Sequence, residues 1–320
     1  MTRSEAPPVR LPSVRQLRYL VALADRLNFR SAAEACFVTQ STLSSGIKEL
    51  ESQLGAQLFE RDKRSVRLTA IGAQVAERAR RLVAEAGDLA ETVRASRRPL
   101  SGTFRLGAIP TIAPFLLPRT LPPLREQYPE LRLFLREDLT DRLLDRLRAG
   151  ELDAALIALP YETGELELRE LFKDEFWFVA RSDEPLAKTK AVAVERLDVG
   201  DVILLEDGHC LREHAISACG AERGAGRSGI EATSLHTLLQ MVEGGLGVTL
   251  LPEIALKAGI LNGTNLVARP FSTRVPARKI TLASRPSSAR GKDLDLLAEF
   301  FLKNAPRAQK PGIPALRRSR

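Results

Sequence analysis

The chain has 320 residues, 44% of them hydrophobic, which is enough for two or three domains with buried cores. No segment approaches the roughly 20 consecutive apolar residues of a membrane-spanning helix, and residues 1–11 are polar and proline-containing, unlike a signal peptide. Three cysteines are too few, and odd in number, for a disulfide scaffold. We therefore expect a cytoplasmic protein without a membrane partner, whose thiols are buried or redox-active.

The formal charge of +8 is unevenly distributed along the chain. Residues 1–98 carry a net charge of +6, residues 303–320 carry another +6, and the middle of the chain carries −4. A basic first hundred residues joined to a mildly acidic body favours a nucleic-acid-binding module attached to a second domain. A merely solvated basic surface is the alternative.

Three short helices are predicted near the N-terminus, each from a capping residue. Ser13 and Gln16 form a capping box before an apolar face, and Ser31 and Glu34 form a second box before a short alanine-rich helix. Thr39 has the residue type and position to cap a third helix. Cys36 lies in the second helix and is expected to be a small core residue.

The third helix completes a helix-turn-helix pattern. Its apolar residues Leu43, Ile47, Leu50 and Leu54 recur at spacings of 4, 3 and 4, and Gly55 ends it. Two short helices joined by a tight turn, the second with a polar outer face, are typical of DNA-binding helix-turn-helix units. The polar residues expected to reach bases and phosphates in the major groove are Thr39, Gln40, Ser41, Thr42, Ser44 and Ser45.

A basic segment follows the third helix. Residues 60–69 predict a turn between short strands, a wing whose Lys63 and Arg64 would lie beside DNA phosphates. Residues 1–69 are therefore predicted to be a winged helix-turn-helix domain that binds double-stranded DNA. An ordinary helical domain with a charged loop is the competing interpretation.

A long helix is predicted over residues 70–98, followed by a proline-containing linker. Its apolar positions recur at spacings of 4 and 3, as in a coiled-coil seam, so two copies are expected to pair into a homodimer. Packing of this helix on a globular body is the alternative. The seam positions are Val75, Ala79, Leu82, Ala86, Leu89 and Val93.

Residues 99–305 have an α/β pattern. Alternating strands and helices favour parallel sheets and two sub-domains around a ligand-binding cleft. Residues 306–320 form a basic tail, expected to be disordered. No metal is expected, since no Cys/His cluster has zinc spacing, and no cofactor, since no glycine-rich nucleotide loop opens a helix. The predicted strands are 103–109, 131–136, 154–158, 176–180 and 279–283, residues 244–252 are predicted to be a helix end that runs into a buried strand, and the clearest helices are 116–128, 139–149 and 294–302.

Several motifs together resemble those of LysR-type transcription regulators. The resemblance covers nearly the whole chain, and it implies a winged helix-turn-helix, a dimerising linker helix and an effector domain similar to periplasmic binding proteins. It also implies operator DNA, assembly into homodimers or homotetramers, and contact with RNA polymerase. The motifs lie at residues 16–20, 31–33, 39–44, 50–51, 55, 58–61, 68–69, 72, 150–153 and 245–248.

Residues 205–212, Leu-Glu-Asp-Gly-His-Cys-Leu-Arg, resemble the peroxide-sensing OxyR branch of that family. The resemblance implies that Cys210 is the peroxidatic cysteine and Cys219 the resolving one, and that hydrogen peroxide is held by Thr111 and Thr140. Glu213 stands where this branch often has an aspartate, and the tail past residue 305 matches nothing in the family.

The chemistry of the two cysteines predicts a switch. Peroxide reacts with a thiolate, so His209 and Arg212 are expected to lower the pKa of Cys210. Nine residues of helix span roughly 13 Å, whereas a disulfide requires Cα atoms within about 7 Å. Joining Cys210 to Cys219 would therefore refold the intervening segment and alter dimer packing.

Two other functions compete with peroxide sensing. The protein could be a LysR-type regulator that binds a small organic effector in the cleft, with incidental cysteines. It could also be a thiol peroxidase, although an attached DNA-binding module disfavours an enzyme. Of the other titratable residues, His214 is expected to lie on the surface.

Overall fold

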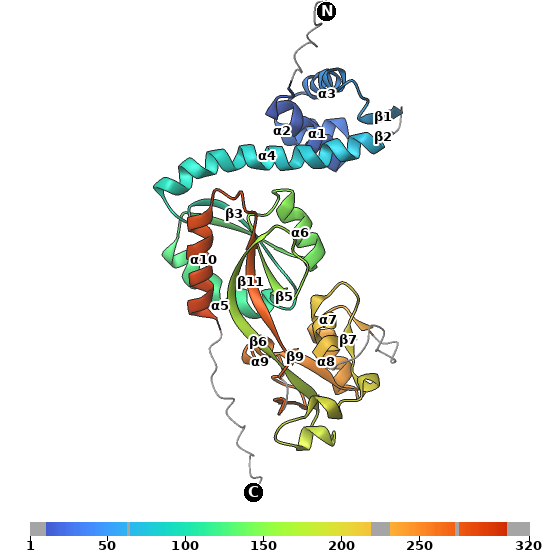
Figure 1. Ribbon diagram of the computed structural model, residues 1–320, viewed down its shortest axis with the longest axis vertical. Helices are drawn as coiled ribbons and strands as arrows, with labels where there is room; N and C mark the ends of the chain where they lie inside the picture. The colour runs from blue at the N-terminus through green and yellow to red at the C-terminus, as the bar shows by residue number, and fades with distance from the viewer. Residues whose placement is uncertain (1–10, 63–64, 219–230, 273–274, 306–320) are drawn as a thin grey trace, which may run out of the picture. The chain divides into compact units, whose positions relative to one another are not determined.

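The computed structural model describes residues 11–62, 65–218, 231–272 and 275–305 (Figure 1). The chain divides into two compact units, one built mainly from residues before Arg97 and one mainly from residues after it. The predictions for Lys63, Arg64, Cys219 and the basic tail 306–320 fall outside the described residues.

The first unit begins with three helices, α1 (Val14–Arg26), α2 (Phe29–Cys36) and α3 (Gln40–Leu54). The capping box of Ser13 and the cap by Thr39 are both present, and Gly55 ends α3 in the left-handed conformation. The predicted box at Ser31 is wrong. The Asn28 side chain caps α2 by accepting a hydrogen bond from the Ser31 backbone N–H, so Ser31 lies inside the first turn.

The apolar faces of these helices form one core. Leu43, Ile47 and Leu50 of α3 are fully buried, but Leu54 is 39% exposed, so its predicted inward position is wrong. Cys36 packs against this core as a half-buried side chain, in keeping with its expected role.

A two-stranded wing and a long helix complete the first unit. Strand β1 (Phe59–Asp62) pairs antiparallel with β2 (Ser65–Leu68), and α4 follows over Ala70–Arg97. A Cβ atom on Gly72 of α4 would lie 2.0 Å from the Leu58 carbonyl oxygen, so only glycine permits this close approach.

The predicted seam of α4 has two different environments. Ala76 and Ala79 are buried in the core of the first unit, with Val75 and Val83 packed beside them. Leu82 and Leu89, further along the helix, are 50% and 73% exposed. The first half of the seam therefore packs on the globular body, and these two leucines are accessible in a single chain.

Seven of the described strands of the second unit form a mixed sheet in the order β10 (Leu266–Arg269), β6 (Glu167–Arg181), β11 (Ala277–Ser284), β5 (Ala154–Leu159), β3 (Gly102–Ala108) and β4 (Leu131–Glu137), with β9 (Thr249–Pro252) also paired to β6. The three strands β4 (Leu131–Glu137), β3 (Gly102–Ala108) and β5 (Ala154–Leu159) are parallel. Strand β11 (Ala277–Ser284) pairs antiparallel with β5 and with β6. Helices α5 (Ala113–Gln127), α6 (Thr140–Arg148) and α10 (Gly291–Asn304) belong to the same part of the unit.

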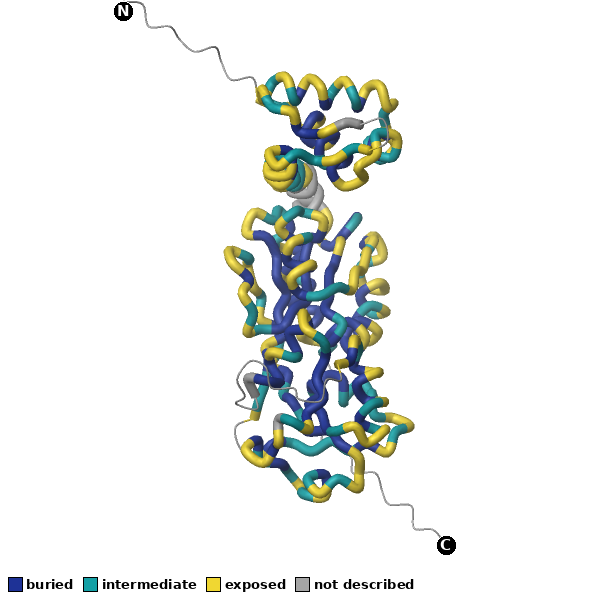
Figure 2. Tube along the Cα trace, turned by 90° about the vertical axis from the view of Figure 1, so that its right-hand side faces the viewer, coloured by how far each residue is buried: buried dark blue, intermediate teal, exposed yellow. Residues whose placement is uncertain are grey.

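Strand β6 (Glu167–Arg181) joins the two sub-domains. Its first part pairs with β11, and its last part pairs with β9 (Thr249–Pro252) and β10 (Leu266–Arg269). The sequence predicts only its apolar end, residues 176–180. Buried positions follow the strands through both sub-domains (Figure 2), so one core continues from one to the other.

The second sub-domain contains short elements around β9. They are the strands β7 (Leu204–Leu205) and β8 (Glu231–Ala232), the helices α7 (Cys210–Ala218), α8 (Leu235–Glu243) and α9 (Glu253–Lys257), and the 3-10 turns η1 (Leu186–Lys188), η2 (Val194–Arg196) and η3 (Val199–Asp201). Helix α7 contacts β7 and β11, which brings its first residue, Cys210, to the boundary between the sub-domains.

Candidate functional site

The candidate site lies where three parallel strands end. Thr140 follows β4, Thr111 follows β3 and Pro160 follows β5, and the carboxyl edge of parallel strands is where α/β proteins bind ligands. Arg278 reaches this edge from β11, and the N-terminus of α7 supplies Cys210. Residues from five distant parts of the sequence therefore meet there.

Cys210 is a free thiol that is only 4% exposed. It is the first residue of α7, and Gly208 before it has φ of +95°, a conformation that glycine adopts without strain. The N-terminal end of a helix favours a nearby negative charge, here a thiolate.

The pKa of the Cys210 thiol is raised, not lowered as the sequence suggests. Burial raises it, and the positive charge of Arg278, the Thr140 hydroxyl and the backbone N–H groups of Leu211 and Cys210 oppose that shift. Burial is the larger effect because the thiol has almost no solvent around it. The resting sulfur is therefore a protonated thiol surrounded by groups that stabilise its anion.

Arg278 is the cation of this site, and sequence reasoning missed it. Its guanidinium is fully buried, donates to the Thr111 hydroxyl at 2.8 Å and to the Thr111 carbonyl at 3.0 Å, and forms an ion pair with Asp174 at 3.0 Å. Asp174 also accepts a hydrogen bond from the Ile254 N–H at 3.0 Å. One signal was available, because Arg278 occupies an inward strand position two residues before buried Ile280.

The two predicted activating residues have other partners. His209 is buried, with Nε2 3.9 Å from a Glu206 carboxylate oxygen, and burial lowers its pKa, so its imidazole is neutral near pH 7. Arg212 forms ion pairs with Asp207 and Glu231, each at 2.9 Å, and donates to the Leu205 carbonyl at 3.0 Å. Arg212 thus ties α7 to β7 and β8, and its role in activating the thiol stays a prediction.

The Thr140 hydroxyl is fully buried beside Cys210. The hydroxyl lowers the pKa of the Cys210 thiol, and its Oγ1 has no hydrogen-bond partner among the described residues. Thr111 Oγ1 accepts from Arg278, so its own O–H remains a donor. The site therefore offers two hydroxyl groups to a small polar molecule.

His214 is buried, which corrects the prediction of a surface residue. It is 6% exposed, and its Nε2 lies 2.8 Å from the Pro160 carbonyl oxygen. Burial lowers the pKa of His214, and Arg278 lowers it further. His214 thus belongs to the same buried polar group as Cys210 and Arg278.

The helix-turn-helix presents its polar residues to solvent. Thr39, Gln40, Ser41, Thr42 and Ser45 are exposed, and Ser44 is half-buried. The Thr39 hydroxyl is occupied as the cap of α3, where it also contacts the hydroxyls of Ser41 and Thr42 at 2.9 and 2.8 Å. Gln40 and Ser45 extend from the first turn and a half of α3, the part that reads base edges in such folds.

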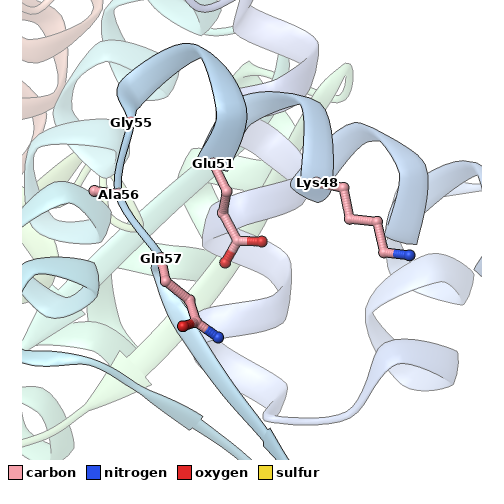
Figure 3. Close-up of a pocket in the computed structure, with 5 residues that line it drawn as sticks. All are labelled: Lys48, Glu51, Gly55, Ala56 and Gln57. Atoms are coloured by element: carbon pink, nitrogen blue, oxygen red, sulfur yellow. The ribbon is translucent and has the colours of Figure 1, made fainter.

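Glu51 fixes the start of the wing to α3. It points from α3 toward the segment that leads into β1 (Figure 3), and its carboxylate accepts the N–H groups of Leu58 and Phe59 at 2.9 and 3.2 Å. The open hollow there measures about 480 Å³ and is lined by Lys48, Glu51, Gly55, Ala56 and Gln57. Because Glu51 is committed to backbone donors, this hollow is a structural junction.

The fold combines a winged helix-turn-helix, as in DNA-binding transcription regulators, with an α/β unit that carries the candidate site. Residues 14–73 match the family "Bacterial regulatory helix-turn-helix protein, lysR family", and residues 97–306 match "LysR substrate binding domain". The chain belongs to the LysR family of bacterial transcription regulators, as its motifs predict. No helix within the described residues is long and apolar enough to cross a membrane, and no cluster of three metal-binding side chains was found among the same residues.

Curated relatives match nearly the full length. The regulator EstR of Acinetobacter baylyi is 41% identical over 291 residues, covering 91% of this chain and 96% of EstR. A probable hydrogen peroxide-inducible genes activator of Streptomyces viridosporus is 40% identical over 294 residues, 90% of this chain and 93% of that protein. The DNA-binding transcriptional dual regulator OxyR of Escherichia coli K12 is 38% identical over 288 residues, 90% and 94% of the two chains.

Solved structures of OxyR proteins share the fold. A cysteine-to-aspartate variant of full-length OxyR from Pseudomonas aeruginosa superposes with a TM-score of 0.79 at 34% identity, covering 93% of this chain and 97% of that one. A cysteine-to-serine variant of Corynebacterium glutamicum OxyR, with hydrogen peroxide bound, gives a TM-score of 0.63 at 31% identity over 93% and 94% of the chains.

Proposed function

We propose that this LysR-family regulator senses hydrogen peroxide through Cys210 and controls oxidative-stress genes. One observation carries the proposal: a free, buried thiol begins α7, where the Thr140 hydroxyl and the charge of Arg278, which also binds Thr111, both favour its anion. The similarity to peroxide-responsive OxyR proteins supports it. In this proposal Thr111 and Thr140 hold the peroxide, and Arg278 stabilises negative charge on sulfur and on the leaving oxygen.

The sensing reaction oxidises one sulfur atom. The Cys210 thiol loses its proton, and the sulfur attacks one oxygen of hydrogen peroxide, so that an S–O bond forms and the O–O bond breaks. The departing hydroxide takes up a proton and leaves as water. Sulfur is oxidised by two electrons to a sulfenic acid. A second thiol, proposed to be Cys219, then displaces water and forms the disulfide.

The length of α7 supports a conformational switch. The helix runs unbroken from Cys210 to Ala218, a rise of about 12 Å at about 1.5 Å per residue. Consecutive Cα atoms in any chain are 3.8 Å apart. One such step beyond Ala218 is too short to reach the roughly 7 Å from the Cα atom of Cys210 that a disulfide requires. A bond from Cys210 to the residue after Ala218 therefore requires α7 to unwind.

Unwinding α7 would disturb its contacts with the rest of the sub-domain. Arg212 would lose its ion pairs with Asp207 and Glu231, which lie beside β7 and β8, and α7 would leave β11. A changed effector domain would alter the packing of homodimers or homotetramers on DNA.

The other partners complete the proposal. Double-stranded promoter DNA would contact the exposed N-terminal turn of α3, and the accessible Leu82 and Leu89 of α4 would support pairing of two chains. RNA polymerase is the proposed downstream partner, and a cytoplasmic location follows from the need to reach the chromosome. The protein acts as a regulator that is oxidised once per signal, without turnover as an enzyme.

The variant Cys210→Ser separates this function from its alternative, a regulator of the same family that binds a small organic effector. After a short peroxide treatment of the full-length protein, mass spectrometry is expected to find the Cys210 and Cys219 peptides joined, and DNA footprints are expected to change. The Ser variant is expected to keep DNA binding and lose both responses. Cys36→Ser is the matched control and should respond as the wild type does. Two free thiols after treatment of the wild type would overturn the proposal.

A further inference from the structure

His214 lies one helical turn after Cys210 on the same buried face of α7. The two side chains are 6% and 4% exposed. Residues four apart on a helix are neighbours, with Cβ atoms about 5–6 Å apart. Helical side chains also lean toward the N-terminus of their helix. These rules direct the imidazole of His214 toward the turn that begins with Cys210.

The hydrogen bond to Pro160 fixes the tautomer of this imidazole. Nε2 lies 2.8 Å from the Pro160 carbonyl oxygen, and a carbonyl oxygen can only accept. Nε2 therefore carries the hydrogen, and Nδ1 of the neutral ring has a lone pair that can only accept. Nδ1 is buried, and no group among the described residues donates to it.

A second buried polar atom interacts with the same thiol. Thr140 Oγ1 has no regular partner among the described residues and contacts only the Cys210 sulfur. Buried polar atoms in proteins are almost always hydrogen-bonded, so two of them beside one thiol point to a small polar ligand. Hydrogen peroxide has an O–H donor on each oxygen and lone pairs on both. These groups match the acceptor Nδ1 of His214 and the hydroxyl of Thr140.

We propose that His214 is a substrate-binding residue, whose unprotonated Nδ1 accepts a hydrogen bond from the peroxide that Cys210 attacks. Thr140 holds the other oxygen. The inference rests on the proposed peroxide-sensing function. In the reaction the S–O bond forms, the O–O bond breaks, and the thiol proton ends on the departing oxygen as water; His214 is unchanged at the end.

The charge environment of His214 keeps the acceptor available. Burial is the main cause that lowers the pKa of His214, and the positive charge of Arg278 on β11 adds to it. Glu213 on its own helix and the Pro160 carbonyl oppose this shift. The other ionisable groups nearby are paired or neutral: Asp174 binds Arg278, the Tyr161 hydroxyl donates to Asp141, and Cys210 is a thiol. Protonation of Nδ1 would turn the acceptor into a donor, so peroxide binding is lost in acid.

The test compares three variants of the full-length protein. His214→Gln retains an N–H donor for Pro160 and an oxygen acceptor, whereas His214→Leu and His214→Met retain neither. The rate of loss of the Cys210 thiol to hydrogen peroxide is measured by quenching and mass spectrometry. Removal of one acceptor hydrogen bond is expected to slow the apolar variants about tenfold at pH 7.5, and Gln is expected to stay within about twofold. His236→Leu, on α8, is the matched control and should not change the rate.

A second reagent separates peroxide binding from effects on the thiol. Alkylation of Cys210 by iodoacetamide needs no peroxide site, so the apolar variants should be alkylated at the wild-type rate. Equal slowing of alkylation and oxidation would mean that His214 acts on the sulfur or on packing, and would overturn the inference, as would apolar variants that react with peroxide at full speed. A wild-type protein whose thiol never reacts with peroxide would instead refute the proposed function itself.

Discussion

Removing one partner of the buried ion pair between Asp174 and Arg278 is predicted to destabilise the second unit strongly. Their side chains are 1% and 0% exposed and 3.0 Å apart. The change Asp174→Asn keeps the shape but removes the negative charge, and its amide N–H group can face the guanidinium, which cannot accept. Leaving one buried charge without its partner costs about 3–5 kcal/mol, so the free energy of unfolding should fall by that amount.

A matched control lies on the same two strands. Lys279 of β11 and Glu170 of β6 form an ion pair at 2.9 Å, but each side chain is 57% exposed. Exposed pairs contribute about 0–1 kcal/mol, so Glu170→Gln should change stability by no more than that. Trp177 on β6 is the only tryptophan of the chain, and its fluorescence in urea reports unfolding of the second unit. Equal losses from the two changes, or a loss below 1 kcal/mol for Asp174→Asn, would refute the reasoning.

Three further predictions concern the caps, the glycines and pH. Thr39→Ala should lower the stability of the first unit by about 1 kcal/mol in thermal unfolding and weaken DNA binding, because the first turn of α3 loses its cap; unchanged melting would contradict it. Gly72→Ala should destabilise the first unit by about 1–3 kcal/mol, since its Cβ meets a carbonyl oxygen at 2.0 Å. Gly87→Ala on the same helix, with open space around it, should be neutral or stabilising. Burial lowers the pKa of His209 and His214, so the unfolded chain binds more protons than the folded one below about pH 6.5. Stability should therefore fall as pH drops from 7 to 5.5, and urea midpoints of a His209→Gln, His214→Gln double variant should fall less.

The sequence predicted the elements whose determinants are local. The capping residues Ser13 and Thr39 act within one helical turn, so their pattern is visible in four consecutive letters. The predicted cap at Ser31 failed because Asn28, three residues earlier, offers the same chemistry and the helix begins there. Motif spacing likewise identified the family.

Burial at the ends of the predicted faces depended on more distant contacts. Leu54 continues the apolar spacing of α3, yet the helix ends there and the side chain stays 39% exposed. The seam of α4 divides in the same way, because the core of the first unit covers Ala79 but not Leu82. The spacing of apolar residues in the sequence defines one face of a helix. The elements that pack against that face decide which of its residues are buried.

The sequence by itself determined the family and many of the helices and strands, because each follows from neighbouring residues, and it singled out Cys210 as the candidate reactive cysteine. Only the tertiary structure decided the environment of that cysteine. Arg278, Asp174 and Thr111 are separated by more than sixty residues in the chain, and they meet because β3, β6 and β11 belong to one sheet. The same packing buries His214 against Pro160 and raises the pKa of Cys210. Desolvation and charge act between groups that are close in space. Residue types and their spacing along the chain therefore do not reveal how these effects change the pKa of Cys210.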